Sequence, residues 1–152
     1  MCGARSYVSI LMRLPLLLLS LVLFAQTTLP AAELKASEMK MKETLHAVIT
    51  QQLAAFRADD YKAAYVFADA SIKEQFPLEA FEQMVRTGYP LIAKSTEAVF
   101  GLTLDNGDAA VVNVRVVGAN KETLSYQYLL KRDGENWRIA GVSLLEDKSL
   151  TV

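Results

Sequence analysis

The chain has few of the side chains that support covalent or metal-based chemistry. Its 152 residues include one cysteine, Cys2, and one histidine, His46. Cys2 falls in a leader that we expect to be removed, which leaves no disulfide, no thiol nucleophile and no thiolate metal ligand. Without a second histidine a metal site would need carboxylates alone, and no acidic cluster has ligand spacing. The sequence therefore predicts neither a metal nor a cofactor.

The chain also lacks an apolar run long enough for a permanent membrane span. The run at residues 14–24 has 11 residues and as a helix would extend about 17 Å, against the ~30 Å of a bilayer core. Arg5 and Arg13 precede it, and small residues end at Ala32, an order typical of a secretory signal peptide. We predict a signal peptide over residues 1–32 and an exported protein, periplasmic or secreted.

Details of the leader stay open. Cleavage after Ala25 or Ala36 is an alternative to cleavage after Ala32, and Met12 is a second candidate start because the apolar run follows it directly. A further alternative is that the leader is not cleaved and that its apolar run acts as a membrane anchor. Cys2 precedes the run, so it does not fit a lipid-modified cysteine at the cleavage point.

Positive charge is scarce in what remains, residues 33–152. Losing Arg5 and Arg13 leaves 14 of the 16 basic residues beside all 17 acidic ones, a net charge of −3. No basic stripe remains that could neutralise a phosphate backbone, so we expect no nucleic-acid partner. A segment of about 120 residues can bury roughly two-thirds of its unfolded surface, enough for one domain.

Three turn signals divide the C-terminal part of the chain into alternating segments. They are Asn106-Gly107, Asn120-Lys121 and Asp133-Gly134, and glycine after Asn or Asp supplies the positive φ of tight hairpins. Four strands are predicted, at about residues 95–104, 109–118, 122–132 and 136–145. Strands this long curve, and Gly101 and Gly141 are candidate bulge points. The side chains expected to face the core include Phe100, Leu102, Leu104, Val112, Val114, Tyr126, Tyr128 and Ile139.

Residues 37–90 have a helical period instead. Ser37 is a candidate N-cap for a first helix running to about Ala58. Asp59-Asp60 would cap a second helix that ends near Ile72. Pro77 fits the start of a third.

The third helix has stop signals as well. Gly88 fits the position after its last turn, and Pro90 would block its continuation. The sequence thus predicts an α+β fold, in which three N-terminal helices pack on a curved four-stranded antiparallel meander. Helices on one face of a curved sheet make a cone with a pocket at its mouth.

Two stretches carry a family resemblance. One is VITQQLAAF at residues 48–56, which leads into residues 60–65, and the other is WRIAGV at residues 137–142. Both resemble the nuclear transport factor 2-like superfamily, an α+β cone also described as cystatin-like. The run at residues 76–90 is similar to a small bacterial family of exported proteins named only as a domain of unknown function (DUF4864-like). The resemblance implies a nuclear transport factor 2-like domain over residues 33–152, with a pocket and with dimers through the sheet, but no reaction.

A dense set of amphipathic rings predicts a ligand pocket, because tyrosines supply both apolar surface and polar tips. Gln52 falls inside an apolar helix stripe, where its amide either faces the pocket or satisfies backbone groups. Arg86 either holds an anionic ligand or pairs with Glu82 one turn earlier. Aromatic residues at such spacings are also common in cores. The predicted ligand-binding residues are Gln52, Tyr61, Tyr65, Arg86, Tyr89, Tyr126, Tyr128 and Trp137.

The inward strand positions offer no carboxylate or histidine for acid–base chemistry. Enzymes of the resembled superfamily, such as ketosteroid isomerases and dehydratases, place such groups inside the cone. We therefore predict a non-catalytic module that binds a small apolar or weakly anionic ligand. The alternative is an isomerase- or hydrolyase-type enzyme that uses Asp69 or His46 with a pocket tyrosine. The plainer roles are a bond to a helix or loop terminus for Asp69 and a solvated side chain for His46.

Apolar residues on both faces of the strands predict a homodimer. Val111 and Val117 point away from the inward valines, and Val99 and Leu129 do the same on the flanking strands. A sheet covered by helices on one side should be polar on the other, so we expect the outer face to be buried against a second copy. The plainer explanation is the β-propensity of valine on a half-exposed sheet.

Overall fold

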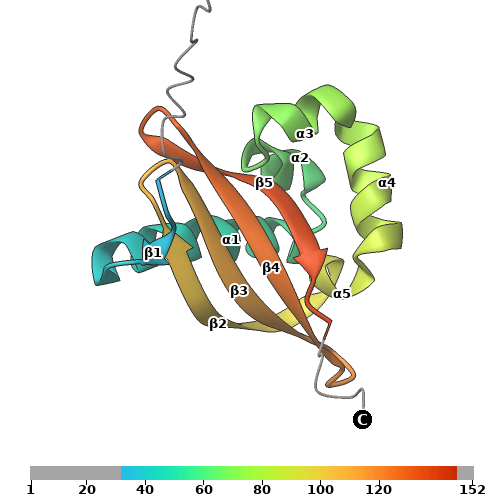
Figure 1. The fold of residues 1–152 in the computed structure, drawn as a ribbon. Helices are drawn as coiled ribbons and strands as arrows, with labels where there is room; N and C mark the ends of the chain where they lie inside the picture. Colours follow the sequence, from blue (N-terminus) through green and yellow to red (C-terminus); the bar gives the residue numbers. More distant parts are fainter. Residues whose placement is uncertain (1–31, 147–152) are drawn as a thin grey trace, which may run out of the picture.

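The computed structural model of the chain describes residues 32–146. Most of the predicted signal peptide, with Cys2 and the candidate start Met12, lies outside the described residues. Along the described part the order is β1 (Lys35–Ala36), α1 (Met39–Arg57), α2 (Tyr61–Val66), α3 (Ala70–Gln75), α4 (Leu78–Gly88), α5 (Pro90–Ala93), β2 (Ser95–Asp105), β3 (Ala109–Gly118), β4 (Thr123–Asp133) and β5 (Asn136–Leu144). The fold is α+β, with helices behind a twisted sheet (Figure 1).

The strands form one antiparallel sheet in chain order, from β1 to β5. The four long strands lie within one residue of their predicted bounds. Gly107 and Gly134 have φ values of 91° and 60°, as their hairpin turns require, and Lys121 takes a φ of 67° in the remaining turn. The two-residue strand β1, paired with the end of β2, was not predicted.

A β-bulge in β2 corrects the predicted inward face of that strand. The register with β3 shifts between Phe100 and Thr103, at the predicted bulge point Gly101. Beyond the shift Thr103 is buried, with 2% of its surface exposed, whereas Leu102 is 56% exposed. Leu104 therefore lies on the opposite face from Thr103. The inward prediction for Leu102 and Leu104 was wrong because an extra residue reverses the period of two.

The predicted second helix is two short helices, α2 and α3. Between them the Asp69 N–H donates to the Ile139 carbonyl and the Ile139 N–H donates to the Phe67 carbonyl, both at 2.8 Å. Ala68 thus forms a parallel bridge with Ile139 on the edge of β5. This pairing uses backbone groups that a continuous helix would need, so the prediction of one helix to Ile72 was wrong.

The helix ends differ from the predictions in two places. Ser37 does not cap α1, because its N–H donates to the Thr103 carbonyl at 3.0 Å and prolongs the pairing of β1 with β2. The N-cap is Glu38. Gly88 is the last residue of α4 and has no positive φ. Pro90 begins α5 rather than a loop, since the φ of proline suits a first helical turn.

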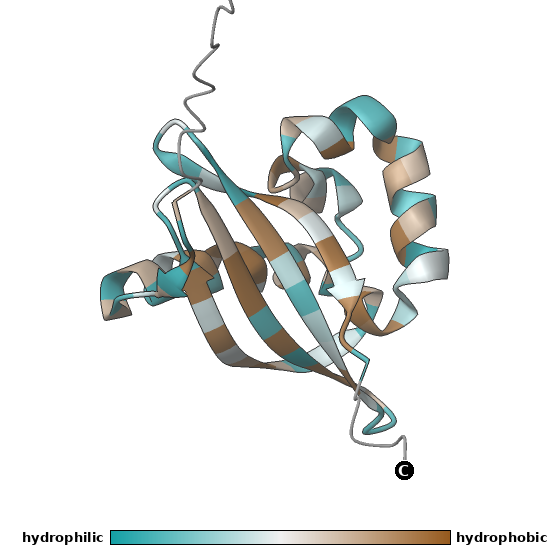
Figure 2. Cartoon of the chain, in the orientation of Figure 1, coloured by the Kyte–Doolittle hydropathy of each residue, from teal (hydrophilic) through white to brown (hydrophobic). Residues whose placement is uncertain are grey.

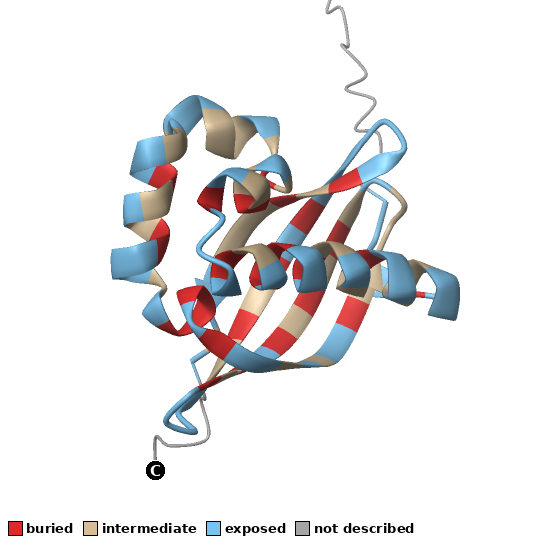
Figure 3. Cartoon of the chain, turned by 180° about the vertical axis from the view of Figure 1, so that it is seen from behind, coloured by how far each residue is buried: buried red, intermediate tan, exposed pale blue. Residues whose placement is uncertain are grey.

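The core lies between the sheet and α1, which crosses one face of it (Figure 3). The inward valines of β3 are fully buried, and so is the apolar stripe of α1. Figure 2 shows the same division as bands of apolar and polar residues along the strands. On the sheet and α1 the side chains with 0% of their surface exposed are Leu45, Ile49, Ala110, Val112, Val114, Val116, Tyr128 and Leu130. No helix in the described part is both long and apolar enough to cross a membrane.

Candidate functional site

A cavity of about 280 Å³ lies between α1, the α2–α4 region and strands β4 and β5. Its wall is mostly aliphatic and aromatic. Of the predicted ligand-binding residues, Gln52, Tyr89 and Tyr128 contribute to it. The other lining residues are Phe56, Ala68, Ile72, Phe76, Phe81, Met84, Val85, Ile92, Ile139, Gly141 and Val142.

Tyr128 differs from the other polar side chains of this wall in its burial and hydrogen bonding. It lies on β4, its residue surface is 0% exposed, and its hydroxyl has no hydrogen-bond partner among the described residues. Burial, and to a smaller extent the neighbouring Tyr126 and Tyr89, raises the pKa of Tyr128. The hydroxyl is therefore protonated at physiological pH and available as a donor.

Gln52 and Tyr89, the other polar residues of the wall, have protein partners. The Gln52 amide nitrogen donates to the Ala64 carbonyl at 3.3 Å, which uses one of its two N–H groups. The Tyr89 hydroxyl donates to the Val142 carbonyl at 3.0 Å, which joins the end of α4 to β5. Both alternatives for Gln52 hold together, since it lines the cavity and satisfies a backbone group.

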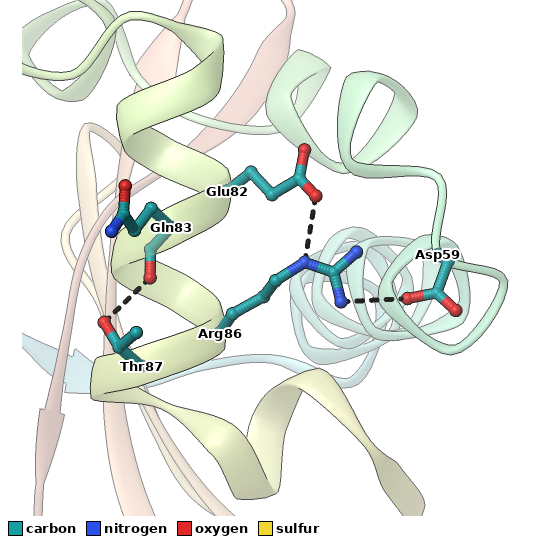
Figure 4. Close-up of polar contacts among 5 residues, drawn as sticks. All are labelled: Asp59, Glu82, Gln83, Arg86 and Thr87. Carbon is teal, nitrogen blue, oxygen red and sulfur yellow. Dashed lines mark hydrogen bonds and ion pairs between the residues drawn. The ribbon is translucent and has the colours of Figure 1, made fainter.

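Arg86 is not in the cavity wall. Its Nε donates to Glu82 at 2.9 Å and its Nη1 lies 3.3 Å from an Asp59 carboxylate oxygen (Figure 4). The guanidinium also lies 4.2 Å from the centre of the Tyr61 ring. Arg86 thus joins α4 to the turn after α1, and its partner is Glu82, the simpler alternative. No cation reaches the cavity from this position.

The other predicted aromatic residues, Tyr61, Tyr65, Tyr126 and Trp137, are also absent from the cavity wall. The Tyr65 hydroxyl donates to the Phe76 carbonyl at 2.8 Å, and Tyr61 packs beside Phe56. Trp137 is buried, with 4% of its surface exposed. Tyr126 lines a separate surface groove of about 440 Å³. Tyr89 lines both this groove and the cavity. The prediction gathered these rings into one pocket, whereas the structure distributes them among the core, a helix contact and the groove.

Asp69 is the N-cap of α3. Its carboxylate accepts hydrogen bonds from the Ser71 N–H at 3.2 Å and the Ser71 hydroxyl at 2.6 Å. The Ser71 hydroxyl is the main reason that the pKa of Asp69 is lowered. A carboxylate held ionised in this way is a weak base, and Asp69 does not line the cavity.

His46 lies in the first half of α1 and packs on β2. Its ring stacks on Phe100 with centres 4.1 Å apart, and its Nε2 lies 2.9 Å from the Thr103 hydroxyl. Burial, with a smaller effect of Lys42, lowers the pKa of His46. The expectation of a merely solvated side chain was wrong, because the bulge in β2 brings Thr103 to this face. The acid–base alternative needs His46 or Asp69 at the cavity, and neither lines it.

The predicted site did not include the part of the wall that α3 and α4 contribute. Phe76 sits between these helices, and Met84 lies one position from the apolar stripe of α4. The sequence does indicate this part of the wall: the adjacent residues Met84 and Val85 are both apolar, which widens the apolar face of α4 beyond a single stripe. Among the described residues, no three His, Cys, Asp or Glu side chains are grouped as metal ligands.

The sequence of this domain identifies its family. The family described as Domain of unknown function (DUF4864) matches residues 38–152. The chain belongs to this family. The DUF4864 match includes every residue that lines the cavity, so the cavity lies within the part of the chain that matches the family. No curated protein matches the chain.

Among solved structures the chain is similar to Aln2 from a Streptomyces species, with 13% sequence identity and a TM-score of 0.47. The similarity covers 74% of this chain and 95% of that one. At this level it says nothing about the function of a DUF4864 domain. The resemblance to the nuclear transport factor 2-like superfamily agrees with the observed architecture, in which helices cover one face of a bent antiparallel sheet.

Proposed function

We propose that this DUF4864 domain binds a small, mainly apolar molecule in the cavity between α1, α4 and β4–β5. The observation that carries the proposal is the hydroxyl of Tyr128, a residue of the apolar cavity wall, which is buried without a protein partner among the described residues. A buried polar group normally has a hydrogen-bond partner, and leaving it without one costs free energy. A bound molecule supplies that partner.

The size of the cavity and its position support binding as well. Pockets that hold drug-sized ligands begin at about 300 Å³, and the volume of about 280 Å³ comes close to that size. Ile72, Phe76 and Met84 are only partly buried, which gives the cavity a thin wall on the side of α3 and α4.

A tryptophan placed in the cavity is expected to displace the ligand. Met84→Trp extends a bulkier ring from the cavity wall, and Gln83→Trp places the same ring on the neighbouring exposed position of α4 (Figure 4). Native mass spectrometry of protein purified after expression from the full sequence should detect a co-purifying small molecule with the wild type and with Gln83→Trp. With Met84→Trp the bound mass should disappear. Equal occupancy in all three proteins, or none in the wild type, would contradict the proposal.

The domain is proposed to act outside the cytoplasm, as the signal-peptide pattern of residues 1–32 supports. Intact mass spectrometry of the protein from a periplasmic extract or culture medium is expected to show a chain that begins near Glu33. A full-length chain found in the cytosol contradicts export.

We propose, as a second feature, that two copies associate through the outer face of the sheet. Val99, Leu102 and Leu129 expose 45%, 56% and 38% of their surface there. Leu104 and Leu129 flank Val111 across the strands, which makes one apolar row. Such patches often mark protein contacts. A polar pair, Asn113 and Gln127, borders the row and lies within hydrogen-bond distance at 3.4 Å.

A charge in this row is expected to separate the copies. Leu129→Glu would bury two carboxylates in a two-fold interface, so light scattering at tens of micromolar protein should change from the mass of two chains to that of one. Val66→Glu is the matched control, because Val66 is 54% exposed but lies on α2, on the helical side of the sheet. A wild type with the mass of a single chain would rule out the dimer.

A further inference from the structure

The cavity wall has a composition that restricts the chemistry of its ligand. Its polar side-chain groups are the Gln52 amide and the hydroxyls of Tyr89 and Tyr128. The Gln52 nitrogen and the Tyr89 hydroxyl already donate to the backbone carbonyls of Ala64 and Val142. Of these three groups, the Tyr128 hydroxyl is the donor without a protein partner among the described residues.

The wall carries no charge. No Asp, Glu, Lys, Arg or His is among its lining residues, and Arg86, the cation predicted to hold an anionic ligand, is paired with Glu82 and Asp59 instead. An ion moved from water to such a site would lose its hydration without a counter-charge, which costs far more than burying an amide or a hydroxyl. Of the two ligand types expected from the sequence, the wall fits the apolar one and not the anionic one.

The volume sets the size of the ligand. An apolar cavity of roughly 150 Å³ engineered in another protein accommodates benzene, and pockets for drug-sized ligands begin at about 300 Å³. At about 280 Å³ this cavity lies between the two. One or two small rings, or a short branched chain, would fill it.

We infer that the ligand is an uncharged molecule of this size with an apolar body and one hydrogen-bond acceptor, such as a carbonyl oxygen, that takes the proton of the Tyr128 hydroxyl in a hydrogen bond. The inference deepens the proposed function and rests on it. The Gln52 amide provides a second polar contact from the α1 side of the wall. The aliphatic and aromatic side chains around both residues hold the apolar body of the ligand by burying its surface.

Three probes that share one shape test the inference. 4-Methylacetophenone has the acceptor, 4-isopropenyltoluene replaces its carbonyl oxygen by a CH₂ group, and 4-methylbenzoate replaces the acetyl group by an anion. Binding to protein purified after expression from the full sequence, and freed of co-purifying molecules by refolding, is measured by calorimetry or chemical-shift titration. The ketone is expected to bind about tenfold more tightly than the alkene, the effect of one hydrogen bond. The carboxylate is expected not to bind at concentrations that saturate the ketone site.

Tyr128→Phe assigns the difference to the hydroxyl. The variant should weaken ketone binding about tenfold and leave the Kd of the alkene unchanged. The unchanged alkene affinity also shows that the variant is folded with its cavity intact. Gln83→Phe on the exposed face of α4 should change neither Kd.

The outcomes separate the inference from the proposed function. If ketone and alkene bind equally and Tyr128→Phe has no effect, or if 4-methylbenzoate binds most tightly, the inferred ligand class is overturned while binding in the cavity stands. If none of the three probes binds the wild type and none competes with a co-purified molecule, the proposed function fails as well.

Discussion

Replacing Gln52 by glutamate is expected to make the stability of the domain strongly pH-dependent. Gln52 is 4% exposed, and its nitrogen donates to the Ala64 carbonyl. A glutamate there keeps the size of the side chain, but its ionised form has no proton to donate and is buried in an uncharged wall. Burial disfavours that form and raises the carboxyl pKa above its ordinary value of about 4.3.

The sign follows from linkage. A group whose pKa is raised by folding destabilises the protein as pH rises above the unfolded value, and each pH unit up to the folded value costs about 1.4 kcal/mol. Between pH 4 and pH 7 the loss should therefore reach about 3–4 kcal/mol. At pH 4 the protonated carboxyl donates to Ala64 as the amide did, so Gln52→Glu should then be close to the wild type.

Urea unfolding at pH 4 and pH 7 measures the effect, with Gln83→Glu as the control at an exposed helical position. The control should follow the pH dependence of the wild type. Equal stability of Gln52→Glu and wild type at pH 7 would mean that water reaches Gln52 freely, and the description of Gln52 as a buried residue of an uncharged wall would be wrong.

The sheet was predictable because its signals are local. Glycine after Asn106 and Asp133 fixes two hairpin turns, and the alternation along β3 is uninterrupted, with every second residue from Ala110 to Val116 fully buried. Short turns then determine which strands pair. The same locality explains the error in β2, where a bulge shifts the phase without any change in composition apart from Gly101.

The helices were less predictable because a distant partner determines their ends. The break between α2 and α3 depends on Ile139, which belongs to the final strand. Ser37 has the chemistry of a helix cap, but the pairing of β1 with β2 takes its N–H. Periodicity describes which face of a helix is apolar and says nothing about contacts made far along the chain.

The kinds of residue in the candidate site could be predicted from the sequence, but not which individual residues line the cavity. Inside the apolar stripe of α1, Gln52 was correctly identified as an amide that needs partners, and Tyr128 as an inward-facing residue. Tyr65 and Trp137 have the same pattern in the sequence but lie elsewhere in the fold. The hydroxyl of a tyrosine donates to a backbone carbonyl as readily as to a ligand. Only the three-dimensional structure shows which of these partners it has.

Tyr128→Phe is expected to stabilise the ligand-free protein, whereas Tyr65→Phe should destabilise it. Both substitutions remove one hydroxyl from a tyrosine. The Tyr128 hydroxyl is buried without a partner in the described part of the chain, a situation that costs about 1–3 kcal/mol, so its removal should raise the free energy of unfolding by up to that amount and Tm by several degrees. The Tyr65 hydroxyl donates to the Phe76 carbonyl at 2.8 Å, and its loss should lower the free energy of unfolding by about 1 kcal/mol.

The comparison needs protein refolded from urea, because a co-purified ligand would stabilise the wild type through the very hydroxyl that the variant lacks. Thermal and urea unfolding of the three proteins then give the two differences. A Tyr128→Phe variant that loses as much stability as Tyr65→Phe would show that the hydroxyl has a partner even without ligand, such as a water molecule inside the cavity. A gain in stability would mean that the wild-type residue is kept at a cost to folding, which is the behaviour expected of a side chain retained for binding.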